Sequence, residues 1–279
     1  MTVVLTPAEL RAELARRSRP VVFVPTMGAL HEGHVSLMRI ARERGSTVVA
    51  SIYVNPMQFG PSEDLDAYPK PLESDLEKCE AVGVDLVFTP PTLYADDSTI
   101  SIHESRLSFG LCGASRPGHF DGVCTVVAKL FNLVQPDAAV FGEKDFQQLA
   151  VIRRMVRDLD FPVEIIGGPI IRESDGLAMS SRNVYLSPDE RSQAVVLNRT
   201  LARAREAIEN GERSAAAIEK QIREHLEFGE IDYVAVVDPD TLEPLEEVGQ
   251  QLLVAIAVFF GKTRLIDNLC LRSLDAAKS

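Results

Sequence analysis

Two histidines, His31 and His34, are the first residues in the chain whose type and spacing could support chemistry. They close the segment P-T-M-G-A-L-H-E-G-H at residues 25–34, which follows a short apolar run at residues 21–24. The run predicts a buried strand, and the near-helical spacing of apolar residues after His34 predicts a helix that ends at Gly45. Unpaired N–H groups and the positive end of the helix dipole attract phosphate at such a helix start. Because imidazoles can donate hydrogen bonds there, the segment predicts a site for a nucleotide phosphate chain.

Three other interpretations of this segment compete with the phosphate site. A zinc-protease motif needs two histidines four residues apart on a helix. Here they are three apart, with Gly33 between Glu32 and His34, so metal ligation is not expected. A dinucleotide fingerprint needs three glycines in the pattern G-x-G-x-x-G, and only Gly28 and Gly33 are available. A surface loop whose histidines have no role is the third alternative, and the sequence leaves it open.

A second junction of strand and helix carries a lysine. Residues 137–141 predict another buried strand, which ends at Gly142, and Asp145 and Gln148 have the spacing of a helix-capping box. Lys144 lies at the turn between strand and helix, and lysine is a mobile point charge suited to phosphate. Since this geometry repeats that of the histidine segment, we expect Lys144 to face phosphate as well. A surface lysine without a role is the alternative.

Two further segments bring polar groups that suit ligands. M-S-S-R at residues 179–182 combines two hydroxyl donors with an arginine, which suits a phosphate chain. A polar turn with a solvated arginine is the alternative. Asn55 and Gln58 follow the apolar strand predicted at residues 47–54. Ligands bind beyond the carboxyl ends of the strands in an open parallel sheet, so these amides are expected at the binding edge, unless they only satisfy a turn.

Two loops between the predicted elements could also contact ligands. Residues 60–71 are polar, acidic and proline-bearing, and long loops of this kind are often lids. Residues 110–122 are a glycine-rich stretch with Arg116 and His119, for which an ordinary mobile loop is the alternative. The G-K-T at residues 261–263 is not a P-loop, because that motif needs another glycine five residues earlier, where this chain has isoleucine. A turn between two strands is expected there.

The order of the predicted elements defines the fold class. Strands and helices alternate up to about residue 170, which predicts an α/β fold with a Rossmann-like doubly wound parallel sheet. Two helices and then three strands follow, and they predict a smaller C-terminal α+β domain, so we expect domains at residues 1–170 and 171–279. The predicted strands are residues 21–24, 47–54, 85–88, 99–107, 137–141, 163–166, 231–237, 251–259 and 263–271, and the later helices are residues 72–81, 123–133, 188–209 and 214–228.

Composition limits the class of protein. The chain has 279 residues, 46% of them hydrophobic, which is enough for one large or two ordinary domains. No apolar run could span a bilayer and the N-terminus lacks the charged start of a signal peptide, so we expect a soluble, cytoplasmic protein without a membrane partner. The net charge of −12 argues against a nucleic-acid partner, which needs a basic surface. The four cysteines form no C-x-x-C pair, so buried free thiols are expected.

Five segments together resemble the pantothenate synthetase (pantoate–β-alanine ligase) family. They occur in that family's order and span nearly the whole chain, and the set is specific although each segment alone is weak. One departure is Phe146, where many members carry tyrosine, but it has no assigned role. More distantly, two of the segments resemble the nucleotide motifs of H-x-G-H nucleotidyltransferases and class I aminoacyl-tRNA synthetases. The five are P-T-M-G-A-L-H-E-G-H at 25–34, N-P-M-Q-F at 55–59, G-H-F-D-G-V at 118–123, F-G-E-K-D with Q-Q at 141–148, and M-S-S-R-N at 179–183.

The resemblance implies an ATP-dependent ligase that condenses pantoate with β-alanine. The product is pantothenate, formed through a pantoyl-adenylate with release of AMP and diphosphate. Magnesium is implied as a cofactor with unknown ligands, and a homodimer is implied as the assembly. In this interpretation residues 1–170 bind nucleotide and pantoate, and residues 171–279 form a lid.

The resemblance and the residue chemistry together assign the site. Charge builds on phosphoryl oxygens, so the catalytic work falls to cations and donors, with His34 the best candidate to assist the leaving diphosphate. Pantoate is placed on Gln58 and Gln148, with Asn55 at the same edge. The catalytic set is His34, His31, Lys144, Ser180, Ser181 and Arg182, and the nucleotide is placed on Met27, Gly28, Ala29, Leu30, His31, Glu32, Gly33, His34, Gly142, Glu143, Lys144, Asp145, Ile171, Met179, Ser180, Ser181 and Arg182.

Two other function classes stay open on sequence grounds. One is a nucleotidyltransferase that hands AMP to a phosphorylated acceptor, or a tRNA ligase, although the net charge of −12 weighs against tRNA. The other is a nucleotide sensor without catalysis, which would not need both Lys144 and the M-S-S-R segment aimed at phosphate. Release of AMP and diphosphate only when pantoate and β-alanine are present would separate these classes.

Overall fold

The computed structural model describes residues 1–61 and 63–272, and within them the chain forms two compact units. Ser62, in the loop predicted at residues 60–71, and residues 273–279, in the predicted C-terminal domain, lie outside the described residues. The main division between the units falls between Ile171 and Arg172. The N-terminal unit comprises Met1–Arg106, Arg116–Glu143 and Val151–Ile171, and the C-terminal unit comprises Leu107–Ser115, Lys144–Ala150 and the chain from Arg172.

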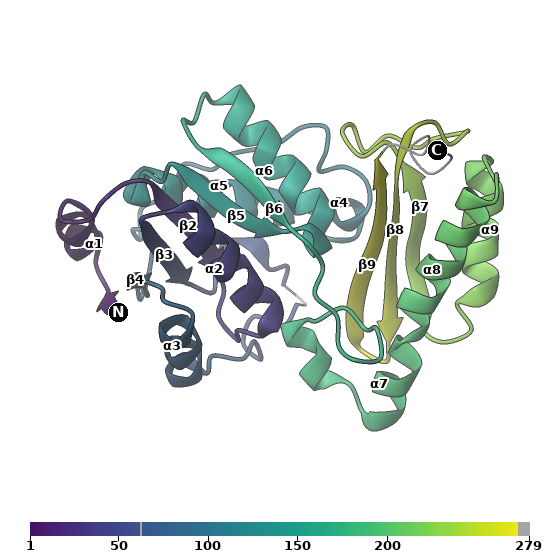
Figure 1. Ribbon diagram of the computed structural model, residues 1–279, viewed down its shortest axis with the longest axis horizontal. Helices are drawn as coiled ribbons and strands as arrows, with labels where there is room; N and C mark the ends of the chain where they lie inside the picture. The colour runs from purple at the N-terminus through teal and green to yellow at the C-terminus, as the bar shows by residue number, and fades with distance from the viewer. Residues whose placement is uncertain (62, 273–279) are drawn as a thin grey trace. The chain divides into compact units, whose positions relative to one another are not determined.

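The N-terminal unit is built on a six-stranded parallel sheet (Figure 1). Its strand order is β1-β4-β3-β2-β5-β6, so the chain leaves the central strand β2 toward β3 on one side and later returns to β5 on the other. Such a reversal defines a doubly wound sheet, and ligands bind beyond the carboxyl ends of its strands. The predicted Rossmann-like sheet is therefore confirmed. The strands are β1 (Thr2–Val4), β2 (Val21–Thr26), β3 (Thr47–Ile52), β4 (Leu86–Phe88), β5 (Ala138–Gly142) and β6 (Glu164–Gly168).

Apolar runs form these strands because helices cover both faces of the sheet. Alternate residues of a strand point to opposite faces. Val22 and Val24 pack in one cluster with Met38 of α2, whereas Phe23 meets Phe131 of α5 with ring centroids 6.5 Å apart. Strand β2 is thus held from both sides and gives firm support to the loop after it. The helices are α1 (Pro7–Leu14), α2 (Glu32–Arg44), α3 (Leu72–Ala81), α5 (His119–Val134) and α6 (Phe146–Asp158).

The C-terminal unit is a three-stranded antiparallel sheet with helices on one face (Figure 1). Its core joins Leu197 and Leu201 of α8, Ile218 of α9, and Val254 of the central strand. The smaller α+β unit expected after residue 170 is therefore present, and the G-K-T segment is a turn between two of its strands, as predicted. The elements are α7 (Pro188–Ala194), α8 (Val196–Glu209), α9 (Ala215–His225), β7 (Glu230–Val237), β8 (Gln251–Phe260) and β9 (Thr263–Arg272).

Several predicted elements need correction. The strand predicted at residues 99–107 is wrong, because the segment bonds to side chains of α5 instead of to a neighbouring strand. The main-chain N–H of Ile102 donates to Thr125 Oγ1 at 2.9 Å, and the His103 ring lies 3.0 Å from the Asp121 carboxylate. The glycine-rich loop contains the short helix α4 (Cys112–Ser115) and the first turn of α5, and the helix predicted at 188–209 is divided at Val195.

Two short segments from the first 170 residues belong to the C-terminal unit. Gln147 is buried and fastens them together, because its Oε1 accepts from Cys112 N at 2.9 Å and its Nε2 donates to Leu107 O at 2.8 Å. The neighbouring Phe146 packs with Leu253 on the sheet face opposite α8 and α9. The turn that carries Lys144 is therefore part of the C-terminal unit, although the strand before it belongs to the N-terminal one.

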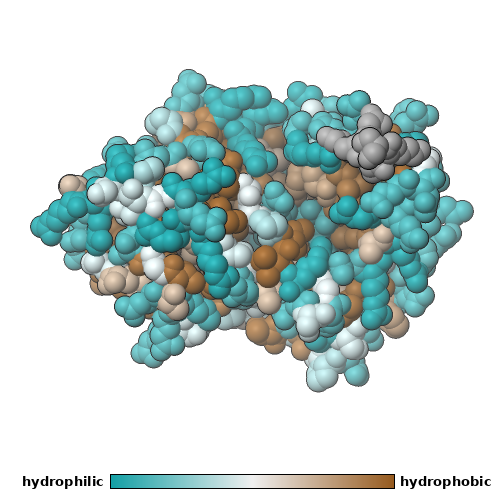
Figure 2. All heavy atoms as spheres, in the orientation of Figure 1, coloured by the Kyte–Doolittle hydropathy of each residue, from teal (hydrophilic) through white to brown (hydrophobic). Residues whose placement is uncertain are grey.

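The surface drawn in Figure 2 is mostly hydrophilic, with apolar side chains in smaller groups between the polar ones. A quarter of all residues are charged, which accounts for this cover. Over residues 1–61 and 63–272, the helices are too short or too polar for any of them to cross a membrane.

Candidate active site

His31 and His34 cap the start of helix α2, because the ring of each accepts a hydrogen bond from a main-chain N–H group of the first turn. His31 is the N-cap residue, and its Nδ1 accepts from Gly33 N at 3.1 Å. The main-chain N–H of His31 donates to His34 Nδ1 at 3.3 Å, and the two ring centroids lie 4.2 Å apart. Since Nδ1 is an acceptor in both rings, each neutral ring carries its proton on Nε2. Each ring therefore has an Nε2–H group near the positive end of a 13-residue helix.

The side-chain amide of Asn55 has all its hydrogen bonds within the protein, and one of them orients Gln58. The Asn55 side chain is 1% exposed, and its Nδ2 donates to Gln58 Oε1 and to Gly122 O, both at 3.1 Å. Its Oδ1 accepts from Met57 N and from Tyr94 Oη. An amide has two donor hydrogens and two acceptor lone pairs, so Asn55 has no bond left for a ligand and its work is to orient Gln58.

Gln58 has the amide that can exchange its partner for a ligand. It lies in the 3-10 turn η1 (Pro56–Gln58), and its Nε2 donates to Met27 Sδ at 3.1 Å. A thioether sulfur is a weak acceptor, so a substrate oxygen would be a better one. The structure thus brings Gln58 together with Met27 of the histidine segment, within the N-terminal unit.

Arg116 and His119 fasten the loop after Gln58. Arg116 forms two bonds to the Glu63 carboxylate, at 2.7 and 2.6 Å, and the ring of His119 lies 2.8 Å from Gln58 O. Burial alone would raise the pKa of Glu63, but the hydrogen bonds and charge of Arg116 outweigh it and lower that pKa. Both residues form hydrogen bonds within the protein here, and a ligand role for residues 110–122 stays a prediction.

Lys144 is held by its backbone against strand β9. Its carbonyl oxygen accepts from Asn268 Nδ2 at 3.0 Å, and its ammonium group lies 3.9 Å from the Asp145 carboxylate. The Lys144 side chain is 19% exposed. Gln148 is half-buried one turn further along, in the first turn of α6. These residues belong to the C-terminal unit.

The M-S-S-R segment is a polar turn fixed to the same strand. Ser180 Oγ accepts from Arg182 N at 3.2 Å and begins the 3-10 turn η3 (Ser181–Tyr185). The chain before it is anchored by Arg172, which makes bonds of 2.7 and 3.0 Å to the Asp267 carboxylate. Asp267 precedes Asn268 on β9, so neighbouring residues of one strand hold both the Lys144 turn and the approach to Ser180.

The predicted residues therefore form two groups, one in each unit. Met27 to His34, Asn55, Gln58, Gly142, Glu143 and Ile171 belong to the N-terminal unit, and Lys144, Asp145, Gln148 and Met179 to Arg182 belong to the C-terminal unit. The described part of the chain has no group of three or more His, Cys, Asp or Glu side chains arranged to hold a metal.

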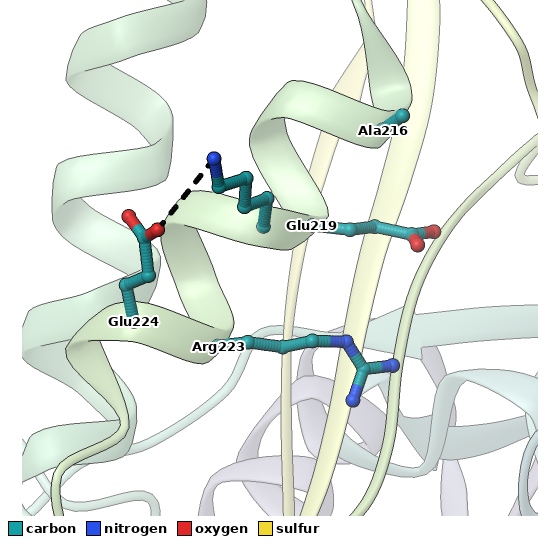
Figure 3. Close-up of a pocket in the computed structure, with 5 residues that line it drawn as sticks. Ala216, Glu219, Arg223 and Glu224 are labelled. Atoms are coloured by element: carbon teal, nitrogen blue, oxygen red, sulfur yellow. Dashed lines mark ion pairs between the residues drawn. The ribbon is translucent and has the colours of Figure 1, made fainter.

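A surface pocket on α9 contains none of the predicted residues (Figure 3). It is lined by Ala216, Glu219, Lys220, Arg223 and Glu224. Two of these side chains serve the outer edge of β7, because Glu219 accepts from Val236 N at 2.9 Å and Arg223 donates to Val234 O at 3.3 Å. These two side chains therefore bond to the main chain at the edge of β7. The pocket contains no residue of the candidate active site.

The fold and the candidate site together indicate the class of protein. A doubly wound sheet whose central strand leads into paired histidines at a helix start is an α/β nucleotide-binding architecture. The family model described as "Pantoate-beta-alanine ligase" matches residues 2–270. The chain belongs to the pantoate–β-alanine ligase family, so the resemblance carried by the five segments is confirmed and the protein is a ligase.

Known relatives agree with this membership over nearly their whole length. A pantothenate synthetase of Heliobacterium modesticaldum is 55% identical over 262 residues, which are 92% of this chain and 93% of the relative. The crystal structure of a pantothenate synthetase from Thermus thermophilus has a TM-score of 0.93 at 50% identity and covers 96% of this chain and 99% of that one. A pantoate-beta-alanine ligase from Francisella tularensis, complexed with beta-gamma ATP and beta-alanine, has a TM-score of 0.78 at 29% identity and covers 97% of both.

Proposed function

We propose that this ligase joins pantoate to β-alanine through a pantoyl-adenylate. The pantoate carboxylate attacks the α-phosphorus of ATP, and the bond to the leaving diphosphate breaks. The amine of β-alanine then attacks the acyl carbon, AMP leaves, and pantothenate is the product. The Francisella relative, solved with beta-gamma ATP and beta-alanine, supports ATP and β-alanine as ligands of this family.

The observation that carries the proposal is the pair of Nε2 donors at the start of α2. Charge moves onto the phosphoryl oxygens and the leaving diphosphate in the first step, so donors placed in advance lower the barrier. His31 and His34 are held by main-chain bonds to their Nδ1 atoms before any substrate arrives. We assign to His34 the hydrogen bond or proton donated to diphosphate, and to His31 a second donor.

The C-terminal unit is proposed to supply the cationic share of the phosphate contacts. Lys144 is loosely paired with Asp145 and can move its ammonium group to a more highly charged partner. Ser180, Ser181 and Arg182 add two hydroxyl groups and a guanidinium, which together suit phosphate oxygens. We propose that the rest of the C-terminal unit acts as a lid that delivers these groups.

Gln58 and Gln148 are proposed to bind pantoate. Neutral amides can bond to its hydroxyl and carboxylate groups without trapping the anion by charge. Asn55 takes part through Gln58, because its own polar atoms are already satisfied. For the second step we assign no protein base, since an acyl-adenylate is activated and positioning the amine can provide much of the rate.

Magnesium, the assembly and the location are further parts of the proposal. Magnesium prefers oxygen ligands and commonly binds through substrate phosphates with one or two carboxylates, and Asp145 beside Lys144 is one of three acidic residues, with Glu32 and Glu143, in the proposed nucleotide site. Bound there, the ion would neutralise phosphate charge. We also propose a homodimer, on family resemblance, and a cytoplasmic location, where ATP is supplied.

The test is to follow AMP and diphosphate release while omitting each substrate in turn. The proposal predicts sustained release of both only with ATP, pantoate and β-alanine together. A nucleotidyltransferase would release diphosphate with a phosphorylated acceptor instead, and a sensor would bind ATP without turnover. Either of those outcomes would overturn the proposal.

A further inference from the structure

A buried carboxylate outside the assigned site holds the loop that leads into the two histidines. Asp75 lies on α3, and its side chain is 1% exposed. Its Oδ2 accepts from Ala29 N at 2.8 Å and its Oδ1 accepts from Leu30 N at 2.7 Å. Hydrogen bonds to an ionised acceptor are about twice as strong as those between neutral groups. Asp75 therefore fixes the main chain of the two residues immediately before His31 by hydrogen bonds.

The loop needs this grip because its backbone turns through the left-handed region. Gly28 has φ of 87° and Ala29 has φ of 50°. Glycine adopts such angles freely, but they are unfavourable for alanine because its Cβ atom crowds the following carbonyl oxygen. The N–H groups of a turn of this kind converge and form a concave site for an anion. In this protein the Asp75 carboxylate fills that site.

Close packing around Gly28 restricts the turn. A Cβ atom added at Gly28 would lie 3.0 Å from Asp75 Oδ2 and 3.1 Å from Ile52 Cγ2 at the end of β3. The next residues after the turn are the capping pair, in which the main-chain N–H of His31 donates to the His34 ring. The direction of both rings therefore depends on where Asp75 holds Ala29 and Leu30.

We propose that Asp75 is a positioning residue for the adenylation step. Its carboxylate occupies the anion site of the turn at residues 28–30, so that substrate phosphate meets the imidazole N–H groups instead of the main-chain ones. It also fixes the turn in the strained conformation that aims His31 and His34. The inference rests on the proposed role of these histidines in phosphate chemistry.

The test is Asp75→Asn, which keeps the size of the side chain and replaces one acceptor oxygen with an NH2 group. One of the two main-chain N–H groups then faces a donor, and the turn shifts. Because a misplacement of about 1 Å in an active site can reduce the rate on the order of 100-fold, we expect kcat for pantothenate formation to fall by at least about tenfold. The KM for pantoate should stay within about twofold, since Asn55, which lies outside the turn, holds the proposed pantoate ligand Gln58.

Asp137→Asn is the matched control. Asp137 Oδ2 accepts from Val21 N at 2.6 Å, so the same chemical change breaks the same kind of bond at the opposite end of β2. It should lower the free energy of unfolding measured in urea and leave kcat unchanged. If the two variants lose kcat equally, or if folded Asp75→Asn keeps kcat within about twofold, the proposal is wrong.

A second variant covers the case in which Asp75→Asn does not fold. Gly28→Ala presses on the Asp75 contact from the loop side and should lower kcat in the same way, so normal turnover would contradict the proposal. These comparisons use the overall rate of pantothenate formation. A wild-type protein that makes pantothenate without an adenylate would refute the proposed mechanism, whereas equal kcat values of wild type and folded Asp75→Asn would refute the role of Asp75 alone.

Discussion

Replacing His34 by alanine should separate the structural work of this side chain from its catalytic work. The Nδ1 atom accepts from His31 N at 3.3 Å, and loss of a helix-capping bond reduces stability by about 1 kcal/mol. The Nε2 atom is the proposed donor to the leaving diphosphate, and loss of one such donor lowers turnover by about 100- to 1,000-fold, or roughly 2.7–4 kcal/mol. His34→Ala should therefore fold, lose little stability and lose most of its activity.

Thr6→Ala is the matched control for the capping effect. Thr6 caps α1 in the same reciprocal way, because its side chain accepts from Glu9 N at 3.2 Å and the Glu9 carboxylate accepts from Thr6 N. The assay is steady-state AMP formation at saturating substrates, together with urea unfolding of both variants. Both should be destabilised to a similar small extent, and only His34→Ala should lose turnover.

The result that would refute this reasoning is a folded His34→Ala protein with near-normal kcat. A loss of activity in Thr6→Ala as large as that in His34→Ala would also contradict it, because general destabilisation would then explain both. If His34→Ala loses activity and the loss appears only as a raised KM for ATP, the histidine binds ground-state nucleotide and does not assist departure of diphosphate.

Two further predictions concern pantoate binding and the anchor of the M-S-S-R segment. Gln58→Ala should raise the KM for pantoate more than that for ATP, because Gln58 is the proposed pantoate ligand in η1 after β3, whereas the proposed phosphate donors lie at the start of α2; separate titrations of each substrate test this, and equal losses would count against it. Asp267→Ala should lower the free energy of unfolding by about 1.5–3 kcal/mol, since it removes a buried carboxylate that accepts charge-assisted hydrogen bonds from the partly exposed Arg172. Asp175→Ala, which breaks a more exposed pair with Arg191, should change it by less than about 1 kcal/mol, and similar urea midpoints for the two variants would refute the distinction.

Local patterns predicted strands β2 to β9, but they missed β1 and wrongly added a strand at residues 99–107. The histidine segment shows why, because a short apolar run, a glycine and an amphipathic run are all readable within 25 residues. The double capping by His31 and His34 was not predictable, since histidine is not among the preferred N-cap residues. Only the folded structure shows that main-chain N–H groups donate to both Nδ1 atoms.

Contacts between distant parts of the chain account for what the sequence could not show. Asn55 has the type and place of a ligand residue, but Tyr94 and Gly122 use its polar atoms, and nothing near Asn55 in the sequence reports them. In the sequence Asp75 cannot be told from an ordinary surface acid of a polar helix, because the main-chain groups that it bonds are 45 and 46 residues away. Apolar and polar residues alternate over residues 99–107 as they do in a strand, yet Ile102 and His103 bond to side chains of α5 and the segment pairs with no strand.

The central claim is that pantoate is activated before β-alanine arrives, and exchange of labelled diphosphate into ATP tests it most directly. The exchange requires only the first step and its reversal, so it should proceed with enzyme, magnesium, ATP and pantoate, without β-alanine. It should vanish when pantoate is omitted, and it should collapse in Lys144→Ala because diphosphate loses its proposed cation. If no exchange occurs under these conditions while pantothenate forms normally with β-alanine present, a freely reversible adenylate step with releasable diphosphate is wrong.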